Sequence, residues 1–378
     1  MESKDTYFAL LRAAIQQRSG LTAQRSDSAA INSEALRLAQ QQGTSALIYD
    51  RLLSLPADER PDTQTQAFMK QTCARNMMHQ EHMLTVLHRA MTALEGLTPP
   101  NRPVLMKGFT LARLYPKPYL RQCGDIDIFV GKEAYHEGAR LLREAFPEAA
   151  LFDEEKDYYK HYNLTLKNTA VEMHRVSVGF QHPRDIRLYD RLEHEAMFVS
   201  PRQVTTEYGS WLEPEERFNI LFVFIHSWEH FVTETASIRQ FCDLALALNA
   251  VENTTALTAY LRPNLKKLRL MRAWQLYAYI LVTYLGLSPD KVPFYTPRAK
   301  KRAERMLDII LHPQPKQTNK NNAPKNVILR KLYTFFSRLR DAREIAKVEP
   351  CYACHMVTTS IAQSWVRFLR GENTRTWE

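Results

Sequence analysis

The sequence predicts an α+β protein in which a small mixed β-sheet is flanked by helical regions at both ends. Apolar residues follow a helical spacing of three or four in residues 1–98 and again from residue 214 onward. Between these regions, residues 99–213 carry short apolar runs separated by turn residues, which is the pattern of short strands. The 378 residues include 11 glycines, few for an α/β enzyme of this length, and this scarcity favours helix.

The N-terminal region, residues 1–98, is expected to be helical. Its apolar residues at helical spacing are Phe8, Leu11, Ile15, Ala35, Leu38, Ala39, Ile48, Leu52 and Leu55. A longer helix is predicted over residues 66–94. Pro99 and Pro100 end it, because proline has no backbone N–H to donate and cannot continue a helix.

The central region, residues 99–213, is expected to form the sheet. Strands are predicted at residues 104–106, 126–130, 162–166 and 170–176. The last two are joined by Lys167-Asn168-Thr169, a plausible hairpin turn because asparagine tolerates positive φ.

The C-terminal region, residues 214–378, returns to a helical pattern. Pro214 suits the first turn of a helix, and the glutamates around it favour a helix N-terminus. Helices are expected at residues 214–232, 236–251, 255–262, 268–286, 297–311, 325–346 and 357–370. Residues 312–325 are rich in Pro, Asn, Gln and Lys and are expected to form an exposed loop.

Positive charge is concentrated in residues 297–347. This segment holds 14 Lys and Arg against four acidic residues, a net +10 that equals the formal charge of the whole chain. Any attraction to a polyanion or an acidic partner is therefore expected to be local to this segment. The favoured interpretation is a helix that packs on the core and exposes a solvated basic face.

Cysteine usage and hydropathy predict a cytoplasmic protein with no transmembrane segment. The five cysteines are scattered and odd in number, which argues against a disulfide framework. Cys351-Tyr352-Ala353-Cys354-His355 has the spacing of a haem attachment site, but such attachment needs export, and ordinary cysteines are favoured. The first apolar run, residues 7–11, is too short for a signal peptide, and no run reaches the roughly 18 residues of a membrane span.

The candidate chemistry centres on the Asp125-Ile126-Asp127 motif. Successive side chains of a strand point to opposite faces, so Asp125 and Asp127 share one face. Paired carboxylates are the oxygen ligands that Mg²⁺ takes in nucleotide sites, together with substrate phosphates. The pattern is common at solvated turns, so its context decides between the two interpretations.

That context is basic and rich in turn residues. Lys107 and Gly108 end a strand and open a helix, an arrangement that presents backbone N–H groups to phosphate. Lys107 and Arg121 bracket the acidic pair and are expected to neutralise a triphosphate. A third carboxylate, Glu172, shares a strand face with His174 and could complete a metal site, or it could face solvent.

These residues carry a resemblance to a known family. The run from Leu105 through Lys107-Gly108, Tyr115-Pro116 and Asp125-Ile126-Asp127-Ile128, followed by Val171-Glu172-Met173-His174, resembles the uncharacterised bacterial nucleotidyltransferases of the DNA polymerase β-like superfamily. The similarity extends to Ile225-His226 through His230 and to the run from Arg239 to Leu244.

The resemblance implies an activity and a set of roles. It implies two Mg²⁺ (or Mn²⁺) ions, bound by Asp125, Asp127 and Glu172, and transfer of a nucleoside monophosphate from an NTP to an unknown acceptor. Thr110 would take the place of the serine that many relatives have after the glycine, since this chain has Gly108-Phe109 there. The residues that would line or support the site are His174, His226, His230, Arg239 and Asp243.

Two other functions remain open on the sequence. A non-catalytic module would bind NTP with Mg²⁺ and release no pyrophosphate. His226, Glu229 and His230 match the His-x-x-Glu-His pattern of inverted zinc peptidases, with both histidines on one helical face. No third zinc ligand is evident downstream, so the histidines are expected to line the nucleotide site.

Overall fold

A computed structural model of the chain describes residues 3–16, 33–97, 101–151, 160–180, 182–233, 236–313, 336, 339–340 and 342–369. The predicted loop at 312–325 and the predicted helix at 325–346 lie largely outside these ranges. Among the described residues, none of the helices combines the length and the hydropathy of a membrane-spanning segment.

The sheet is mixed and seven-stranded, with the order β3-β4-β5-β2-β1-β7-β6. Its strands are β1 (Val104–Met106), β2 (Asp125–Phe129), β3 (Ala150–Leu151), β4 (His161–Leu166), β5 (Thr169–His174), β6 (Arg202–Thr206) and β7 (Gly209–Glu213). β2 pairs with β5 and β1 pairs with β7 in parallel, and the other neighbours are antiparallel. The α+β class predicted from the sequence is thereby confirmed.

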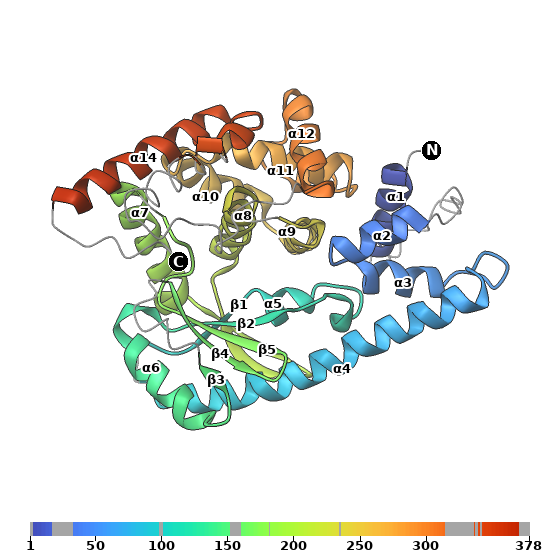
Figure 1. The fold of residues 1–378 in the computed structure, drawn as a ribbon, viewed down its shortest axis with the longest axis horizontal. Coiled ribbons are helices and arrows are strands. Elements are labelled where there is room, and N and C mark those ends of the chain that lie inside the picture. The colour runs from blue at the N-terminus through green and yellow to red at the C-terminus, as the bar shows by residue number, and fades with distance from the viewer. Residues whose placement is uncertain are drawn as a thin grey trace.

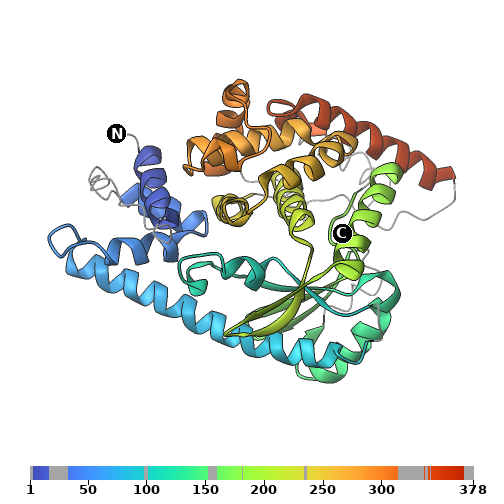
Figure 2. The same ribbon diagram turned by 180° about the vertical axis from the view of Figure 1, so that it is seen from behind.

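Helices flank the sheet on both sides (Figures 1 and 2). Before and within the sheet region they are α1 (Ser3–Gln16), α2 (Ser33–Gln41), α3 (Ser45–Leu53), α4 (Thr63–Leu94), α5 (Gly108–Ala112), η3 (Pro118–Leu120), α6 (Gly131–Ala145), α7 (Pro183–His194) and η5 (Glu195–Val199). After it come α8 (Glu216–Thr233), α9 (Ile238–Ala250), α10 (Thr254–Lys267), α11 (Met271–Thr283), η6 (Pro289–Lys291), η7 (Pro297–Ala299), α12 (Lys300–Leu311) and α14 (Pro350–Leu369).

The two faces of the sheet bury different hydrophobic clusters. Ile126, Ile128 and Met173 pack with the apolar sides of α4 and α6. Met106 and Phe129 belong to a second cluster, shared with helices from both ends of the chain. Because side chains alternate along a strand, the face that carries Phe129 also carries Asp125 and Asp127, which therefore point toward the helical layer.

The structure departs from the sequence prediction at several boundaries. The β6–β7 hairpin was not predicted, since a short strand whose residues alternate between partly buried and exposed positions gives a weak apolar signal. α4 begins at Thr63 rather than residue 66, because the Asp62 carboxylate caps it by accepting from the backbone N–H groups of Gln64 and Thr65, both at 3.0 Å.

Proline positions explain two further differences. α10 continues through Pro263 to Lys267 instead of ending at 262, so the proline removes a backbone donor without ending the helix. α14 begins at Pro350, earlier than the predicted residue 357, with the proline in the first turn, where its missing N–H costs nothing.

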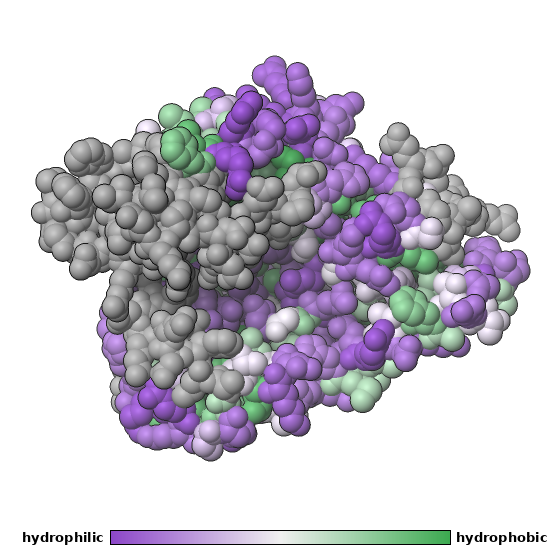
Figure 3. All heavy atoms as spheres, viewed as in Figure 1, coloured by the Kyte–Doolittle hydropathy of each residue, from purple (hydrophilic) through white to green (hydrophobic). Residues whose placement is uncertain are grey.

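The described part of the basic segment includes α12, which packs on the core and exposes basic residues, whereas the basic stretch at 327–345 lies largely outside the described residues. In α12, Ala303, Met306 and Ile310 are buried, while Lys301 and Arg305 are exposed. Hydrophilic residues also dominate the described surface in the view of Figure 3, with hydrophobic residues scattered among them.

Candidate active site

Strand register brings the three predicted acidic residues together. β2 and β5 run parallel with Asp127 beside Glu172, and Asp125 lies two residues before Asp127 on the same face. One carboxylate oxygen from each of these residues lies within 4.8 Å of the other two. The sheet therefore gathers two distant segments of sequence into one acidic cluster.

Asp127 is the most enclosed member of this cluster. Its side chain is fully buried, and its Oδ1 lies 2.6 Å from Lys107 Nζ and 2.8 Å from His174 Nε2. Burial opposes the charge on Asp127, but the Lys107 ammonium and the His174 hydrogen bond outweigh it and hold its pKa below the ordinary value. Asp127 Oδ2 is buried and has no hydrogen-bond partner among the described residues.

The pKa values of the other two carboxylates, Asp125 and Glu172, shift in opposite directions. The negative charge of Asp127, and then burial, raise the pKa of Asp125. Burial also acts against the charge on Glu172, but its hydrogen bond from His174 keeps its pKa below the ordinary value.

This donor set suits a divalent cation. Oxygen ligands from carboxylates are what Mg²⁺ and Mn²⁺ bind, and a cation would also relieve the repulsion between Asp125 and Asp127. The buried, unpartnered Oδ2 of Asp127 is an acceptor that a cation could satisfy. The residues present therefore fit the metal that the nucleotidyltransferase resemblance implies.

Lys107 sits in a strained turn between β1 and α5. Its φ is +46°, in the left-handed region that non-glycine residues rarely adopt. Its backbone carbonyl accepts hydrogen bonds from Thr110 N at 2.8 Å, Leu111 N at 3.2 Å and Thr110 Oγ1 at 2.7 Å. The turn thus directs the Lys107 side chain at Asp127. The Thr110 hydroxyl, expected from the sequence to contact a phosphate, donates its hydrogen bond to the Lys107 carbonyl instead.

Gly108 has a specific reason to be glycine. Its φ is +29°, and a Cβ there would lie 3.5 Å from the carbonyl oxygen of Asp125. The contact distance alone would tolerate a Cβ, so the positive φ is what favours glycine at this position.

Arg121 is placed differently from its predicted position. Its guanidinium forms a buried bidentate pair with Asp243, with Nε to Oδ1 at 2.8 Å and Nη2 to Oδ2 at 2.9 Å. Tyr115 donates to the same Asp243 Oδ1 at 2.8 Å. The expectation that Arg121 neutralises the triphosphate is therefore corrected: Arg121 and Asp243 fasten the segment before β2 onto α9, a long-range pairing that local sequence does not reveal.

Arg239 is a second cation whose charge acts on the acidic cluster. It lies one helical turn before Asp243 on α9, is half-buried, and packs against Gly43, where a Cβ would lie 3.4 Å from Arg239 Nε. No carboxylate of the described residues lies within ion-pair distance of its guanidinium. Its positive charge partly offsets the raised pKa of Asp125, which places the two groups in the same electrostatic environment.

The two histidines of α8 lie next to each other, and one of them contacts Lys107. His226 Nε2 lies 3.3 Å from Lys107 Nζ and 3.1 Å from His230 Nε2. Burial and the Lys107 charge lower the pKa of His226 well below its ordinary value, so it is a neutral imidazole. The Lys107 ammonium can only donate hydrogen bonds, so His226 Nε2 is the acceptor in this contact. The proton of the neutral His226 imidazole is therefore on Nδ1.

The zinc-hydrolase arrangement has no support in this geometry. Glu229 pairs with Lys160 at 2.9 Å and accepts from Gly179 N at 3.3 Å, instead of standing beside the histidines as a base. In the described part of the chain, neither His226 nor His230 belongs to a group of three potential metal ligands. Cys351 and Cys354 are free and exposed.

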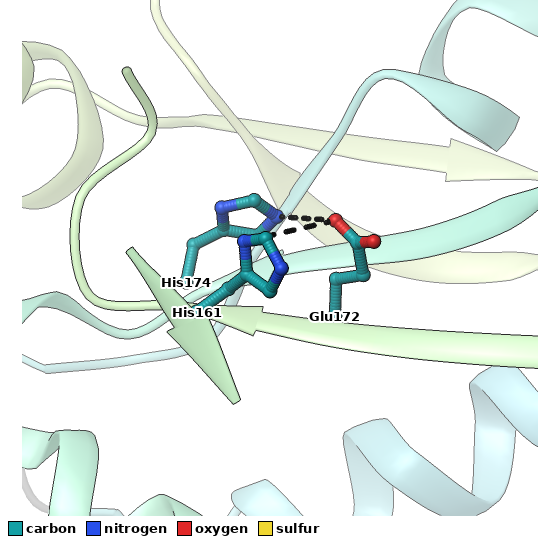
Figure 4. A group of neighbouring side chains, drawn as sticks. All are labelled: His161, Glu172 and His174. Atoms are coloured by element: carbon teal, nitrogen blue, oxygen red, sulfur yellow. Dashed lines mark ion pairs between the residues drawn. The ribbon is translucent and has the colours of Figure 1, made fainter. Parts of the chain in front are cut away.

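His161 was missed in the sequence interpretation. It lies on β4 opposite His174, and Figure 4 shows both imidazoles beside Glu172. The turn predicted at residues 167–169 would pair Leu166 with Ala170 and place Tyr162 opposite His174. The observed turn is one residue shorter, at residues 167–168, and pairs Leu166 with Thr169 and therefore His161 with His174. The predicted strand began one residue too late, at Tyr162.

Comparison with known proteins agrees with this geometry. The family described as "Uncharacterised nucleotidyltransferase" matches residues 29–286, a stretch that includes the whole sheet, every site residue named above and helices α8 to α11. No curated protein and no solved structure matches the chain. The chain belongs to this family of nucleotidyltransferases, and is an enzyme that transfers a phosphorus-containing group.

Proposed function

We propose that this enzyme transfers a nucleoside monophosphate from an NTP to an acceptor hydroxyl in a reaction that depends on Mg²⁺ or Mn²⁺. The observation that carries the proposal is the convergence of Asp125, Asp127 and Glu172 on one sheet face, with Asp127 Oδ2 buried and unpartnered. Family membership supplies the class of reaction.

The three carboxylates would hold the metal. When bound, a divalent cation stabilises the charge that develops on the attacking and leaving oxygens of an in-line displacement. Lys107 and His174 hold Asp127 ionised and oriented through its Oδ1, which leaves Oδ2 available. The sheet thus fixes the ligands before substrate arrives.

The chain's own cations and turn would position the triphosphate. Arg239 has no carboxylate partner among the described residues, and its charge would neutralise part of the triphosphate in place of Arg121. Gly108 lets a phosphate approach the backbone after β1, because it has no side chain at that point. His226 and His230 form the wall opposite the sheet.

The chemical step is a substitution at the α-phosphorus. A new bond forms between the acceptor oxygen and the α-phosphorus, the bond to the β-phosphate bridging oxygen breaks, and pyrophosphate leaves with that electron pair. Glu172 has 24% of its side chain exposed, whereas Asp127 is fully buried, and Glu172 is the candidate to receive the acceptor proton.

Radiolabelled NTPs test this proposal directly. The full chain is incubated with Mg²⁺, a bacterial metabolite extract as the source of acceptors, and each NTP labelled at either the α- or the γ-phosphorus. We expect α-label to appear in a new product and γ-label to appear in pyrophosphate. The Glu172→Gln variant is expected to lower product formation at least ~100-fold.

Other outcomes separate the alternatives. Label transferred from the γ-position would show a phosphotransferase and contradict the proposal. Tight Mg²⁺-dependent NTP binding without pyrophosphate from any NTP would instead show the non-catalytic binding module.

A further inference from the structure

Two imidazoles and one carboxylate meet beside the acidic cluster. β4 and β5 are antiparallel, with His161 directly opposite His174, and Glu172 lies two residues before His174 on the same face. Figure 4 shows the three side chains turned toward one another, with both imidazoles directed at the Glu172 carboxylate. The hairpin register alone therefore builds a group of two nitrogens and one oxygen.

The distances within this group suit a small cation. Glu172 Oε2 lies 3.5 Å from His174 Nε2 and 4.0 Å from His161 Nδ1, and all three ligand atoms lie within 4.8 Å of one another. Tetrahedral bonds of about 2.0–2.2 Å place ligand atoms roughly 3.3–3.6 Å apart. The two distances to Glu172 therefore need to shorten by no more than a few tenths of an ångström, within the reach of side-chain rotation, to hold an ion.

The ligand types select the ion. Mg²⁺ takes oxygen ligands, whereas imidazole nitrogens suit transition metals such as Zn²⁺, Mn²⁺ and Co²⁺. His174 is buried, while the His161 and Glu172 side chains are 14% and 24% exposed, so one side of the group is open to solvent or a ligand. Three protein ligands and an open side are typical of a catalytic rather than a structural metal site.

We propose that His161, Glu172 and His174 form a second metal site, which takes a transition-metal cation and shares Glu172 with the carboxylate site. A metal at His174 Nε2 replaces the proton on that nitrogen, which passes to solvent. The 2.8 Å hydrogen bond from His174 to Asp127 Oδ1 is then lost, and that oxygen keeps its 2.6 Å contact with Lys107. The proposal for this metal site depends only on its three ligands, and it holds whether or not the enzyme catalyses the proposed nucleotidyl transfer.

Cobalt is the probe that tests this site. The full chain is stripped with a chelator and titrated with Co²⁺ in the presence of excess Mg²⁺, which occupies the carboxylate site. We expect one equivalent to bind, with the visible absorption of a four- or five-coordinate ion. His161→Asn should weaken this binding at least ~100-fold, since losing a ligand costs more than losing a residue that supports one.

Matched variants make the result specific. His136, exposed on α6, provides a histidine control, and His136→Asn should bind Co²⁺ like the wild type. Asp125→Asn should also keep Co²⁺ binding, since Asp125 is outside the group. Circular dichroism checks the fold, and His161→Gln, a longer side chain, serves as a second variant if His161→Asn fails to fold.

Two results would overturn the proposal. One is a wild type that binds no stoichiometric Co²⁺ in excess Mg²⁺, and the other is a His161 variant that binds Co²⁺ as tightly as the wild type. Either would show that the histidines serve the carboxylates through hydrogen bonds alone. Absence of nucleotidyl transfer with intact Co²⁺ binding would count against the proposed reaction and leave this site standing.

Discussion

At the scale of single residues, burial is tolerated where a partner of opposite charge is supplied. Asp127 is fully buried yet stays ionised, because Lys107 and His174 both contact its Oδ1. Glu193 on α7 has no ion-pair partner among the residues that the structure describes. Its Oε1 accepts hydrogen bonds from Ser177 N at 2.8 Å and Ser177 Oγ at 2.5 Å, and burial raises its pKa to about 7.

The raised pKa of Glu193 predicts a pH-dependent stability. A carboxyl group whose pKa is higher in the folded state stabilises the fold fully below its unfolded value of 4.5, and this contribution is lost as the pH rises through about 7. Glu193→Gln keeps an oxygen acceptor for Ser177 and cannot ionise. Between pH 4.5 and pH 8 the variant should gain on the order of 3 kcal/mol in unfolding free energy relative to the wild type.

Urea unfolding of both proteins at several pH values measures this difference. Glu195→Gln, at an acidic position of η5 two residues along, is the matched control and should track the wild type. A Glu193→Gln difference that stays constant with pH would show that Glu193 is ionised to the same extent in both states.

At the scale of elements, strand alternation was predictable and long-range pairing was not. The period of two along residues 125–127 and 172–174 was enough to place each pair of side chains on one face. The partner of Arg121 was not predictable, because Asp243 lies on a helix far away in sequence and nothing local links the two. His161 was missed because the predicted turn was one residue too long, which shifts the hairpin register by one and places Tyr162 instead of His161 opposite His174.

The Arg121–Asp243 pair predicts a large effect on the fold. Asp243→Asn would leave the Arg121 guanidinium buried without a counter-charge, and breaking a buried pair from one side costs about 3–5 kcal/mol. Asp308→Asn, an exposed change on α12, should stay within about 0.5 kcal/mol of the wild type. Urea unfolding at neutral pH checks both, and an Asp243→Asn variant as stable as the wild type would show that the pair is not essential to the fold.

At the scale of the whole molecule, the site lies between the sheet and the helical layer. The sheet supplies the carboxylates, α8 supplies His226 against Lys107, and α9 supplies Arg239 and the anchor of Arg121. Figure 1 shows α8 and α9 above the strands, with α4 along the opposite side. The sequence predicted which regions are helical and which form the sheet. It did not predict that the sheet, α8 and α9 come together, because this depends on a hydrophobic core cluster to which both ends of the chain contribute.

This arrangement explains why a short motif is informative here. Asp125-Ile126-Asp127 is a common pattern, and its meaning came from residues that the fold brings to it. Three of these, Glu172, Lys107 and His226, come from β5, the β1–α5 turn and α8.

The central claim is that Asp127 is indispensable for metal-dependent transfer, and pyrophosphate release tests it most directly. Wild type, Asp127→Asn and the exposed-surface control Asp58→Asn are compared with NTP and increasing Mg²⁺. We predict Mg²⁺-dependent pyrophosphate release by the wild type and by Asp58→Asn, and a loss of at least ~1,000-fold in Asp127→Asn, in line with the several kcal/mol that a metal centre contributes. Equal release by Asp127→Asn and the wild type would contradict the claim.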